Sequence, residues 1–362
     1  GLAVLRRDRV LALTRVYRGP EHEDEMVGLF DYCTFGKAVA PPSIDTSMHV
    51  LVDAPHVDHL HPDAGIAIAT AADGEELTRR IYGDRVVWVP WRRPGFQLGL
   101  DIARIQREHP EAIGCILGGH GITAWGASSA DCREHSLEIV ARAEQYLAAH
   151  GVPEPFGAVR DGYAPLAPEE RHARAAYLAP LLRGLAATDA PVVGHYIDAD
   201  PVLDFLSRRE CARLAALGCS CPDHFLRAKV RPLLLDLPAH ADLTQVGKRL
   251  AELHAAYRAD YASYYAAHAT PDSPKMRGAD PAIFLIPGVG MFSFGPDKHT
   301  ARVAGEYFVN TINAMRGAES VSTYAPIPDA EKFRIEYWSL EEAKLARRPK
   351  PKPLASRVAF VT

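Results

Sequence analysis

Two histidines, His59 and His61, lie two positions apart in the stretch VDHLHPDA (57–64). In a β-strand the residues at i and i+2 point to the same face, so both imidazoles can reach one metal ion. The chain holds 16 histidines, and pairs with this spacing also arise by chance in such a sequence. A catalytic zinc ion usually has three protein ligands and one open position, so a third ligand must come from another part of the chain.

His120 is the strongest candidate for this third ligand. It lies in the stretch GGHG (118–121), directly after the apolar segment AIGCIL. The flanking glycines allow the backbone to turn sharply and to bring the imidazole close to other groups. The alternative is that each of these histidines is a core residue whose ring bonds to a backbone carbonyl.

The segments around these histidines alternate between strand and helix patterns. Their β-branched and aromatic content predicts strands at 49–54, 57–61, 85–91 and 112–117. Apolar residues at helical spacing predict helices at 23–35, 62–82 (with a break at Asp73-Gly74), 94–110 and 129–150. Ser128 or Ser129 is a suitable cap for the last of these helices, and Gly151 a suitable stop. Alternating strands and helices are typical of a layered α/β fold.

The second half of the chain follows the same style. It has predicted helices at 167–186, 200–217 and 242–267 and predicted strands at 191–197 and 282–289. The segments GHGITAWG (119–126) and GVGMFSFG (288–295) share three glycines at a constant offset, and each follows an apolar strand and precedes a helix. This pattern indicates an internal duplication in which Val289 stands where the first copy has His120. The alternative is that the strand, glycine turn and helix recur by chance, because this combination is common in α/β proteins.

The composition excludes several classes of protein. The net charge of −4 offers no field that would attract nucleic acid or an anionic membrane surface. No apolar run approaches the roughly 20 residues that cross a bilayer. Six cysteines in 362 residues do not form a disulfide framework, which fits a reducing cytoplasm. We therefore expect a cytoplasmic protein that acts on a small molecule and has neither nucleic acid nor membrane as a partner.

Both ends of the sequence indicate a fragment. The chain begins at Gly1 and ends at SRVAFVT (356–362), which has the composition of a buried strand. The preceding basic, proline-rich segment at 346–356 predicts an exposed, semi-stiff linker.

Three motifs together resemble the class II aldolase/adducin family. They are PPSIDTSMH (41–49), HVDHLHPDA (56–64) and GGHGITAWG (118–126), and their order and spacing agree with that family over about residues 20–150. The later segments, among them TPDSPKMRG (270–278), are similar to one branch of it, the bifunctional rhamnulose-1-phosphate aldolase/short-chain dehydrogenases. In that branch the segment RVAFVT opens a dinucleotide-binding domain. The family's N-terminal phosphate-binding loops have no counterpart in this sequence.

The resemblance implies a role for each matching residue. His59, His61 and His120 would hold a divalent ion, Zn²⁺ or another metal. Asp45 stands at the family's acidic position, often Glu in the aldolases and Asp in the related pentulose-phosphate epimerases, and would be a fourth ligand or the general base. Ser43 lies where the family binds substrate phosphate. Without the family, Ser43 and Asp45 are equally explained as a turn or a helix cap.

The reaction implied by the branch is retro-aldol cleavage of a ketose 1-phosphate. The best match is L-rhamnulose 1-phosphate, which would give dihydroxyacetone phosphate and L-lactaldehyde. A zinc ion on neutral imidazoles is a Lewis acid for the substrate oxygens, and no lysine Schiff base is needed. Two alternatives remain: a pentulose-phosphate epimerase or dehydratase that uses the same site, and a metal-free scaffold similar to adducin.

The stretch CSCPDHFLRAK (219–229) contains further candidates. Cys219, Cys221 and His224 are a conceivable metal set, although they lack the second ligand pair of a structural zinc site. His224, Arg227 and Lys229 are instead expected to contact an anionic group of the substrate.

These observations predict a three-layer α/β/α fold with a degenerate second half. We expect a metal-site core at 1–150, a second half at 151–345, and a linker with the first strand of a truncated dehydrogenase at 346–362. The sequence has no G-x-G-x-x-G turn that could cradle a pyrophosphate, so we expect no NAD binding in this chain. A homo-oligomer is compatible with this organisation.

Overall fold

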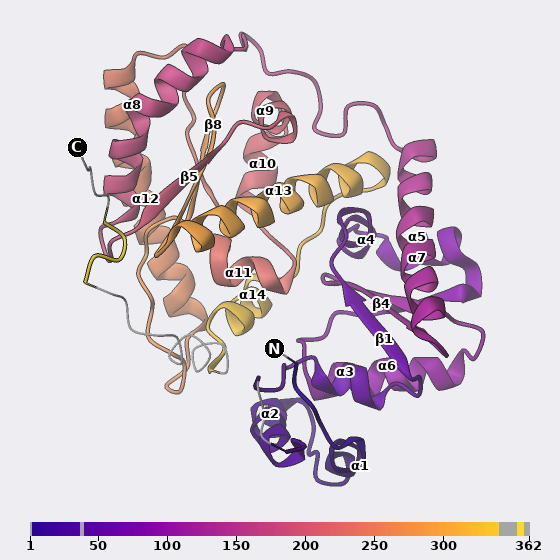
Figure 1. The fold of residues 1–362 in the computed structure, drawn as a ribbon. Coiled ribbons are helices and arrows are strands. Elements are labelled where there is room, and N and C mark those ends of the chain that lie inside the picture. The colour runs from indigo at the N-terminus through magenta and orange to yellow at the C-terminus, as the bar shows by residue number, and fades with distance from the viewer. Residues whose placement is uncertain (1, 37–39, 340–352, 358–362) are drawn as a thin grey trace. The chain divides into compact units, whose positions relative to one another are not determined.

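The computed structural model describes residues 2–36, 40–339 and 353–357 and divides the chain into two units. The first unit is Gly1–Gly151 and the second is Val152–Thr362. Each unit contains one four-stranded sheet with helices packed against it (Figure 1). Of the predicted linker and terminal strand at 346–362, only residues 353–357 lie within the described part of the chain.

The sheet of the first unit has the strand order β1-β4-β3-β2. Its strands are β1 (His56–Leu60), β2 (Val86–Val89), β3 (Gly114–Leu117) and β4 (Gly121–Gly126). β4 runs antiparallel to both β1 and β3, and β3 runs parallel to β2. The central position of β4 places the turn that carries His120 beside the end of β1.

Helices cover both faces of this sheet. The helices of the first unit are α1 (Arg7–Ala12), α2 (Glu23–Leu29), α3 (Thr46–Leu51), α4 (Asp63–Ala69), α5 (Gly74–Tyr82), α6 (Phe96–Glu108) and α7 (Ser129–His150). Apolar residues of α3 and α6 pack with Cys115, Leu117 and Trp125 on one face. α4, α5 and α7 pack on the other face. This arrangement is the predicted α/β/α layering.

Most predicted elements of the first unit are confirmed, with two corrections. The predicted strand at 49–54 is wrong, because Met48, Leu51 and Val52 are fully or nearly fully buried as one side of α3 and the segment after it. The predicted helix at 23–35 is shorter, since α2 ends at Leu29 and continues as a 3-10 turn at Phe30–Cys33. The other 3-10 turns of the chain are Leu13–Arg15, Pro20–His22 and Gly83–Arg85.

The sheet of the second unit repeats the topology of the first. Its order is β5-β8-β7-β6, with β5 (Val193–Ile197), β6 (Leu233–Leu234), β7 (Ile283–Ile286) and β8 (Gly290–Gly295). β8 runs antiparallel to β5 and β7, and β7 runs parallel to β6. β7 and β8 follow β3 and β4 at one constant offset along the chain. The predicted repeat is therefore confirmed as a structural repeat of the whole sheet.

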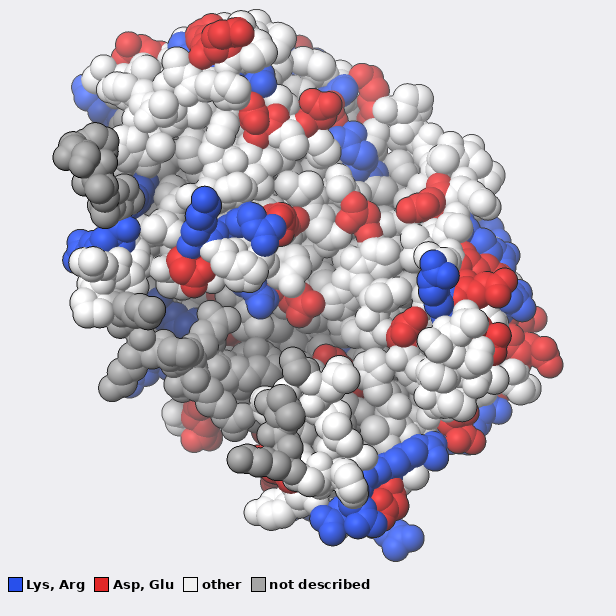
Figure 2. All heavy atoms as spheres, in the orientation of Figure 1, with Lys and Arg blue, Asp and Glu red and all other residues white. Residues whose placement is uncertain are grey.

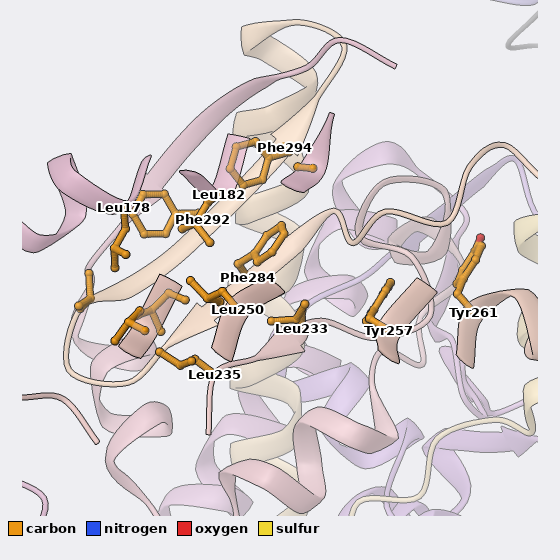
Figure 3. Packing of buried hydrophobic residues seen from close by; sticks show 14 of the residues in the cluster. Leu178, Leu182, Leu233, Leu235, Leu250, Tyr257, Tyr261, Phe284, Phe292 and Phe294 are labelled. Carbon is orange, nitrogen blue, oxygen red and sulfur yellow. The ribbon is translucent and has the colours of Figure 1, made fainter. Parts of the chain in front are cut away.

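The helices of the second unit enclose its own core. They are α8 (Pro168–Ala186), α9 (Asp200–Ser207), α10 (Cys211–Leu217), α11 (Pro222–Ala228), α12 (Leu243–His268), α13 (Lys298–Val321) and α14 (Asp329–Glu336). Leu178 and Leu182 of α8, Leu250 of α12 and Phe284, Phe292 and Phe294 of the sheet form one buried cluster (Figure 3). The single helix predicted at 200–217 is two helices, because Arg208 is extended and forms a bridge with Val159.

The surface and the helices agree with the charge pattern of the sequence. On the face drawn in Figure 2, acidic and basic side chains alternate, and neither sign covers a broad continuous area. Within the described part of the chain, none of the helices combines the length and apolar character that crossing a bilayer requires.

Candidate metal centre

Three imidazole rings meet at one point of the first unit. The Nε2 atom of His59 lies 3.0 Å from Nε2 of His61 and 3.2 Å from Nε2 of His120. The three ligand atoms all lie within 4.8 Å of one another, and no other group of this kind occurs among the described residues. The structure therefore brings together all three histidines that the sequence singled out.

The strand β1 and its partner β4 fix the orientation of His59. Its Nδ1 atom lies 2.9 Å from the carbonyl oxygen of Ile122 and 3.3 Å from the hydroxyl of Thr123. The carbonyl can only accept, so Nδ1 carries the proton and donates it to Ile122. The lone pair of His59 is then on Nε2, which faces the other two rings. A backbone carbonyl that fixes the tautomer in this way is typical of metal-binding histidines.

The turn between β3 and β4 places His120 beside this pair. Gly119 has a φ of 68°, and its N–H donates to the carbonyl of Ala69. Gly121 faces His61 so closely that a Cβ atom would lie 2.6 Å from Cδ2 of that ring. Glycine is thus required on each side of His120 for a different reason: Gly119 adopts a left-handed backbone conformation, and Gly121 leaves room for the ring of His61.

Burial favours the neutral form of His59 and His120. Burial, and then the charge of His61, lower the pKa of His59 to about 4. Burial also holds the pKa of His120 well below its usual range, with further lowering from His59 and His61. Neutral imidazoles are the form that binds metal ions.

The donor set fits a divalent cation of the zinc type. Nitrogen ligands lie about 2.0–2.1 Å from zinc, which puts two ligands of a tetrahedral site roughly 3.3 Å apart. The Nε2 separations of 3.0 and 3.2 Å are close to that value. Nδ1 of the nearly inaccessible His120 has no hydrogen-bond partner among the described residues. Without a cation this cluster would bring three imidazole nitrogens together, with one ring nitrogen of the buried His120 left without compensation.

Asp45 and Ser43 bond to each other, and Asp45 acts electrostatically on His59. The Ser43 hydroxyl donates to the Asp45 carboxylate at 3.0 Å, and the Asp45 N–H donates back to that hydroxyl. Asp45 is the residue before α3, but its side chain makes no capping hydrogen bond to that helix. The charge of Asp45 raises the pKa of His59, in opposition to burial. Its carboxylate is half-buried and is not a member of the three-histidine group.

The residues predicted to bind an anion in the second unit have other contacts. His224 is buried, with Nδ1 2.7 Å from the hydroxyl of Thr311. The rings of His224 and Tyr307 stack, and the Arg227 guanidinium lies over the same tyrosine. Lys229 instead donates to the carbonyl of Gly278 at 2.9 Å. His224 and Arg227 thus share one neighbour, and Lys229 has a different environment.

The cysteines of that segment do not form a metal set with His224. Cys219 and Cys221 are both buried. Burial raises the pKa of the Cys219 thiol to about 12, although a hydrogen bond from Thr311 opposes this shift. Among the described residues, the three histidines of the first unit are the only cluster of side chains that could hold a metal ion.

Two neighbours of the centre were not predicted from the sequence. Thr123 contacts His59 from the adjacent strand, and only the register of β1 and β4 places it there. The ring of Trp91 lies 6.5 Å from that of His120 in an edge-to-face arrangement. Trp91 follows the carboxyl end of β2, which is a common position for residues that line a site in α/β proteins.

The second unit has a different set of residues at the equivalent positions. Matching the registers of the two sheets aligns His59 with Tyr196, His61 with Asp198 and His120 with Val289. The Tyr196 hydroxyl donates to the carbonyl of Val289 at 2.7 Å, and Asp198 lies 3.0 Å from a guanidinium nitrogen of Arg171. An ion pair and a tyrosine thus replace the imidazole cluster, as expected for a degenerate copy.

Comparison with known proteins agrees with this architecture. Residues 22–147 match the Class II Aldolase and Adducin N-terminal domain, and residues 173–345 match the second domain of class II aldolases. The chain belongs to the class II aldolase/adducin family. The two matched segments correspond to the two units of the structure, and the first contains all three histidines.

One curated relative and two solved structures are also similar. The relative, described as the uncharacterized oxidoreductase YuxG of Bacillus subtilis (strain 168), is 32% identical over 342 residues, which are 94% of this chain and 49% of the relative. The chain thus spans about half the length of that protein. An N-terminal class II aldolase domain of a conserved protein from Thermoplasma acidophilum has 24% identity and a TM-score of 0.35, and covers 40% of this chain and 65% of that one. An aldolase II superfamily protein from Pseudomonas syringae has 19% identity and a TM-score of 0.26, and covers 32% and 52%.

Proposed function

We propose that the chain catalyses metal-dependent retro-aldol cleavage of a ketose 1-phosphate. L-Rhamnulose 1-phosphate is the proposed substrate, with dihydroxyacetone phosphate and L-lactaldehyde as products. The main support is the convergence of three Nε2 atoms at spacings that suit one divalent ion. We place this activity in the cytoplasm, with a sugar phosphate as the only partner that the reaction needs.

In this proposal His59, His61 and His120 hold a divalent metal, with Zn²⁺ as the first choice. When bound, such an ion supplies a Lewis acid that stabilises the negative charge that cleavage leaves on the substrate oxygens. The protein contributes three preorganised imidazole ligands. Because His59 is fixed by Ile122 and His61 packs against Gly121, little reorganisation is needed when the ion binds.

Asp45 is the proposed general base. It would take the proton of the hydroxyl whose oxygen becomes the aldehyde carbonyl, so that the carbon–carbon bond can break. The Ser43 hydroxyl, which donates to this carboxylate, would orient it and would also bind the substrate phosphate. This half-buried carboxylate remains accessible to the substrate.

We propose that the whole protein also carries a dehydrogenase. The Bacillus subtilis relative is described as an oxidoreductase and is about twice as long as the matched segment. The present chain has no glycine-rich pyrophosphate turn of the G-x-G-x-x-G type. The oxidoreductase activity would therefore lie outside these residues, and this chain alone would not bind NAD.

A second candidate function is epimerisation of a pentulose phosphate at the same site. The observation that favours it is the aspartate at position 45, where aldolases of this family often have glutamate. Both reactions break a bond next to a carbonyl and develop the same kind of charge, so the metal ligands do not separate them. A metal-free scaffold would need no set of three converging imidazoles.

Product analysis with purified protein tests the proposal. The metal-stripped chain, with and without added Zn²⁺, is incubated with L-rhamnulose 1-phosphate and with L-ribulose 5-phosphate. We expect zinc-dependent release of dihydroxyacetone phosphate from the first substrate, and its loss in Asp45→Asn. Formation of an epimer from the second substrate without cleavage of the first would favour the epimerase. If neither substrate reacts although the metal is bound stoichiometrically, the proposed chemistry is wrong.

A further inference from the structure

Lys229 in the second unit has an unusual backbone. It follows α11 with φ 59° and ψ −177°, a region that is populated almost only by glycine and that costs other residues about 1–3 kcal/mol. Among the described residues, Ser356 is the only other non-glycine with a positive φ. Strain of this kind persists where the surrounding structure holds a side chain in one place.

The amine of Lys229 has an incomplete set of partners. Its Nζ donates to the carbonyl of Gly278 at 2.9 Å and lies 4.2 Å from the centre of the Tyr261 ring. No carboxylate lies within ion-pair distance of it among the described residues. Lys332, the other deeply placed lysine, contacts the Asp329 carboxylate at 3.1 Å and the carbonyl of Leu217. Lys332 has the partners of a structural lysine, and Lys229 does not.

Acid–base groups gather beneath Lys229. Tyr261, at one end of the core row in Figure 3, donates its hydroxyl to the fully buried carboxylate of Glu336. The hydroxyl of Tyr337 lies 2.7 Å from that of Tyr261, and the hydroxyl of Tyr264 donates to the same carboxylate at 3.3 Å. Burial raises the pKa of Glu336. This chain of hydroxyls and one carboxyl group can hold and pass a proton.

The charges around Lys229 balance. Burial lowers the pKa of Lys229 to about 8, with Glu336, Asp280 and Asp189 opposing the shift and Arg277 adding to it. Arg258 pairs with both of these aspartates. Three carboxylates thus face three cationic groups, and no excess positive charge remains that would attract an anion. The geometry favours an uncharged ligand and an amine that is partly unprotonated near neutral pH.

We propose that Lys229 is a reactive amine that forms a reversible imine with a small, uncharged aldehyde or ketone. The side chain is partly exposed, and only one of its N–H groups is used by Gly278. The nitrogen lone pair attacks the carbonyl carbon and forms the C–N bond. Both amine protons pass in turn to the carbonyl oxygen by way of solvent, which reaches this partly exposed position, and the oxygen leaves as water when the C=N bond forms. No oxidant or reductant takes part. Imine formation of this kind is known for lysines whose amine is desolvated in the protein.

Reductive trapping tests this site without use of the metal centre. The full chain is treated with glycolaldehyde and sodium cyanoborohydride at pH 7.5 in the presence of EDTA, and adducts are located by peptide mass spectrometry. An amine with a pKa near 8 is about a hundredfold more often unprotonated at this pH than an ordinary lysine. We expect Lys229 to be labelled at least about tenfold faster than the exposed Lys248, Lys275 and Lys298, with Lys332 unlabelled.

Two controls keep the result decisive. Lys229→Arg retains the charge and should lose this adduct, while the other lysines are labelled as before. The unfolded chain in urea should lose the preference, because all lysines then have similar pKa values. Labelling of the exposed lysines with Lys229 unmodified, or equal labelling of Lys229 in the folded and unfolded chain, would overturn the proposal. Neither outcome depends on whether the aldolase activity is found.

Discussion

Replacing Gly121 by alanine should weaken metal binding although no ligand is removed. The added Cβ would lie 2.6 Å from Cδ2 of His61 and 2.6 Å from the carbonyl oxygen of Leu60. An ordinary carbon contact needs at least about 3.4 Å, so either the ring or the end of β1 must shift by about 0.8 Å. Metal sites tolerate ligand displacements of only about 0.2 Å.

The expected loss follows from this displacement. Changes in groups that only position metal ligands cost about 10–100-fold in affinity, which corresponds to roughly 1.4–2.7 kcal/mol. Overpacking should also destabilise the first unit by about 1–3 kcal/mol. Calorimetric titration of the metal-stripped variant with Zn²⁺, well below its melting temperature, measures the first effect, and thermal unfolding measures the second.

Gly28→Ala is the matched control for this substitution. Gly28 lies in α2 of the same unit, and nothing lies within 4 Å of the position of its added Cβ. Alanine is favoured over glycine inside a helix by about 1 kcal/mol, so this variant should be as stable as the parent or more stable. It should bind Zn²⁺ like the parent. A folded Gly121→Ala protein whose zinc affinity stays within twofold of the parent would refute the reasoning.

Three further predictions concern stability. Zn²⁺ at about 100 times its dissociation constant should stabilise the chain by about 2.7 kcal/mol. Differential scanning fluorimetry should show this as a rise in melting temperature that is lost in His120→Ala. An equal rise in that variant would mean that the ion binds elsewhere. Lys229→Gly should be about 1–3 kcal/mol more stable than Lys229→Ala in urea unfolding, because only glycine relaxes at φ 59°; equal stabilities would mean that the backbone there is unstrained. A hydrogen bond from Arg258 lowers the pKa of Asp189 to about 2, although burial opposes the shift. A carboxyl group with a lowered pKa stabilises the folded state at pH values above its unfolded pKa of about 3.9, and this effect is lost as the pH falls to about 2 and below. Asp189→Asn should therefore lower the free energy of unfolding by about 1 kcal/mol at pH 7, allowing for solvent exposure, and by much less at about pH 2. A constant difference between the two proteins across this pH range would contradict that assignment.

The long helices could be predicted closely because their ends have local signals. Ser128 and Asp131 form a reciprocal capping box, and α7 begins and ends where the sequence indicated. The segment 49–54 shows the limit of such signals. Its β-branched residues predicted a strand, but the side chains of α3 and the following turn pack on α6, where Gly99 lets the backbone of Ser47 approach closely. Tertiary packing overrides local propensity at this point.

The strands β4 and β8 were missed for a different reason. Each begins and ends with glycine, and the sequence indicated only a turn there. Each has one antiparallel neighbour that directly precedes it, β3 or β7, and a second one, β1 or β5, that lies far away along the chain. Such long-range pairing leaves little trace in a local pattern.

The candidate site was predictable in part. The spacing of His59 and His61 indicated a shared face, the glycine-flanked turn indicated His120 as the third ligand, and the family resemblance supported all three. That resemblance was necessary, because the meeting of the three rings depends on the register that pairs Leu60 with Ile122. The carbonyl that orients His59 belongs to the backbone and leaves no mark on residue type. The function of Asp45 remains a prediction.

The most direct test of the metal centre is a calorimetric titration of the metal-stripped chain with Zn²⁺. The arrangement of the three imidazoles predicts one site per chain, which should disappear in each of the variants His59→Ala, His61→Ala and His120→Ala while the protein remains folded. A triple variant that still takes up one equivalent of zinc with unchanged affinity would contradict the assignment.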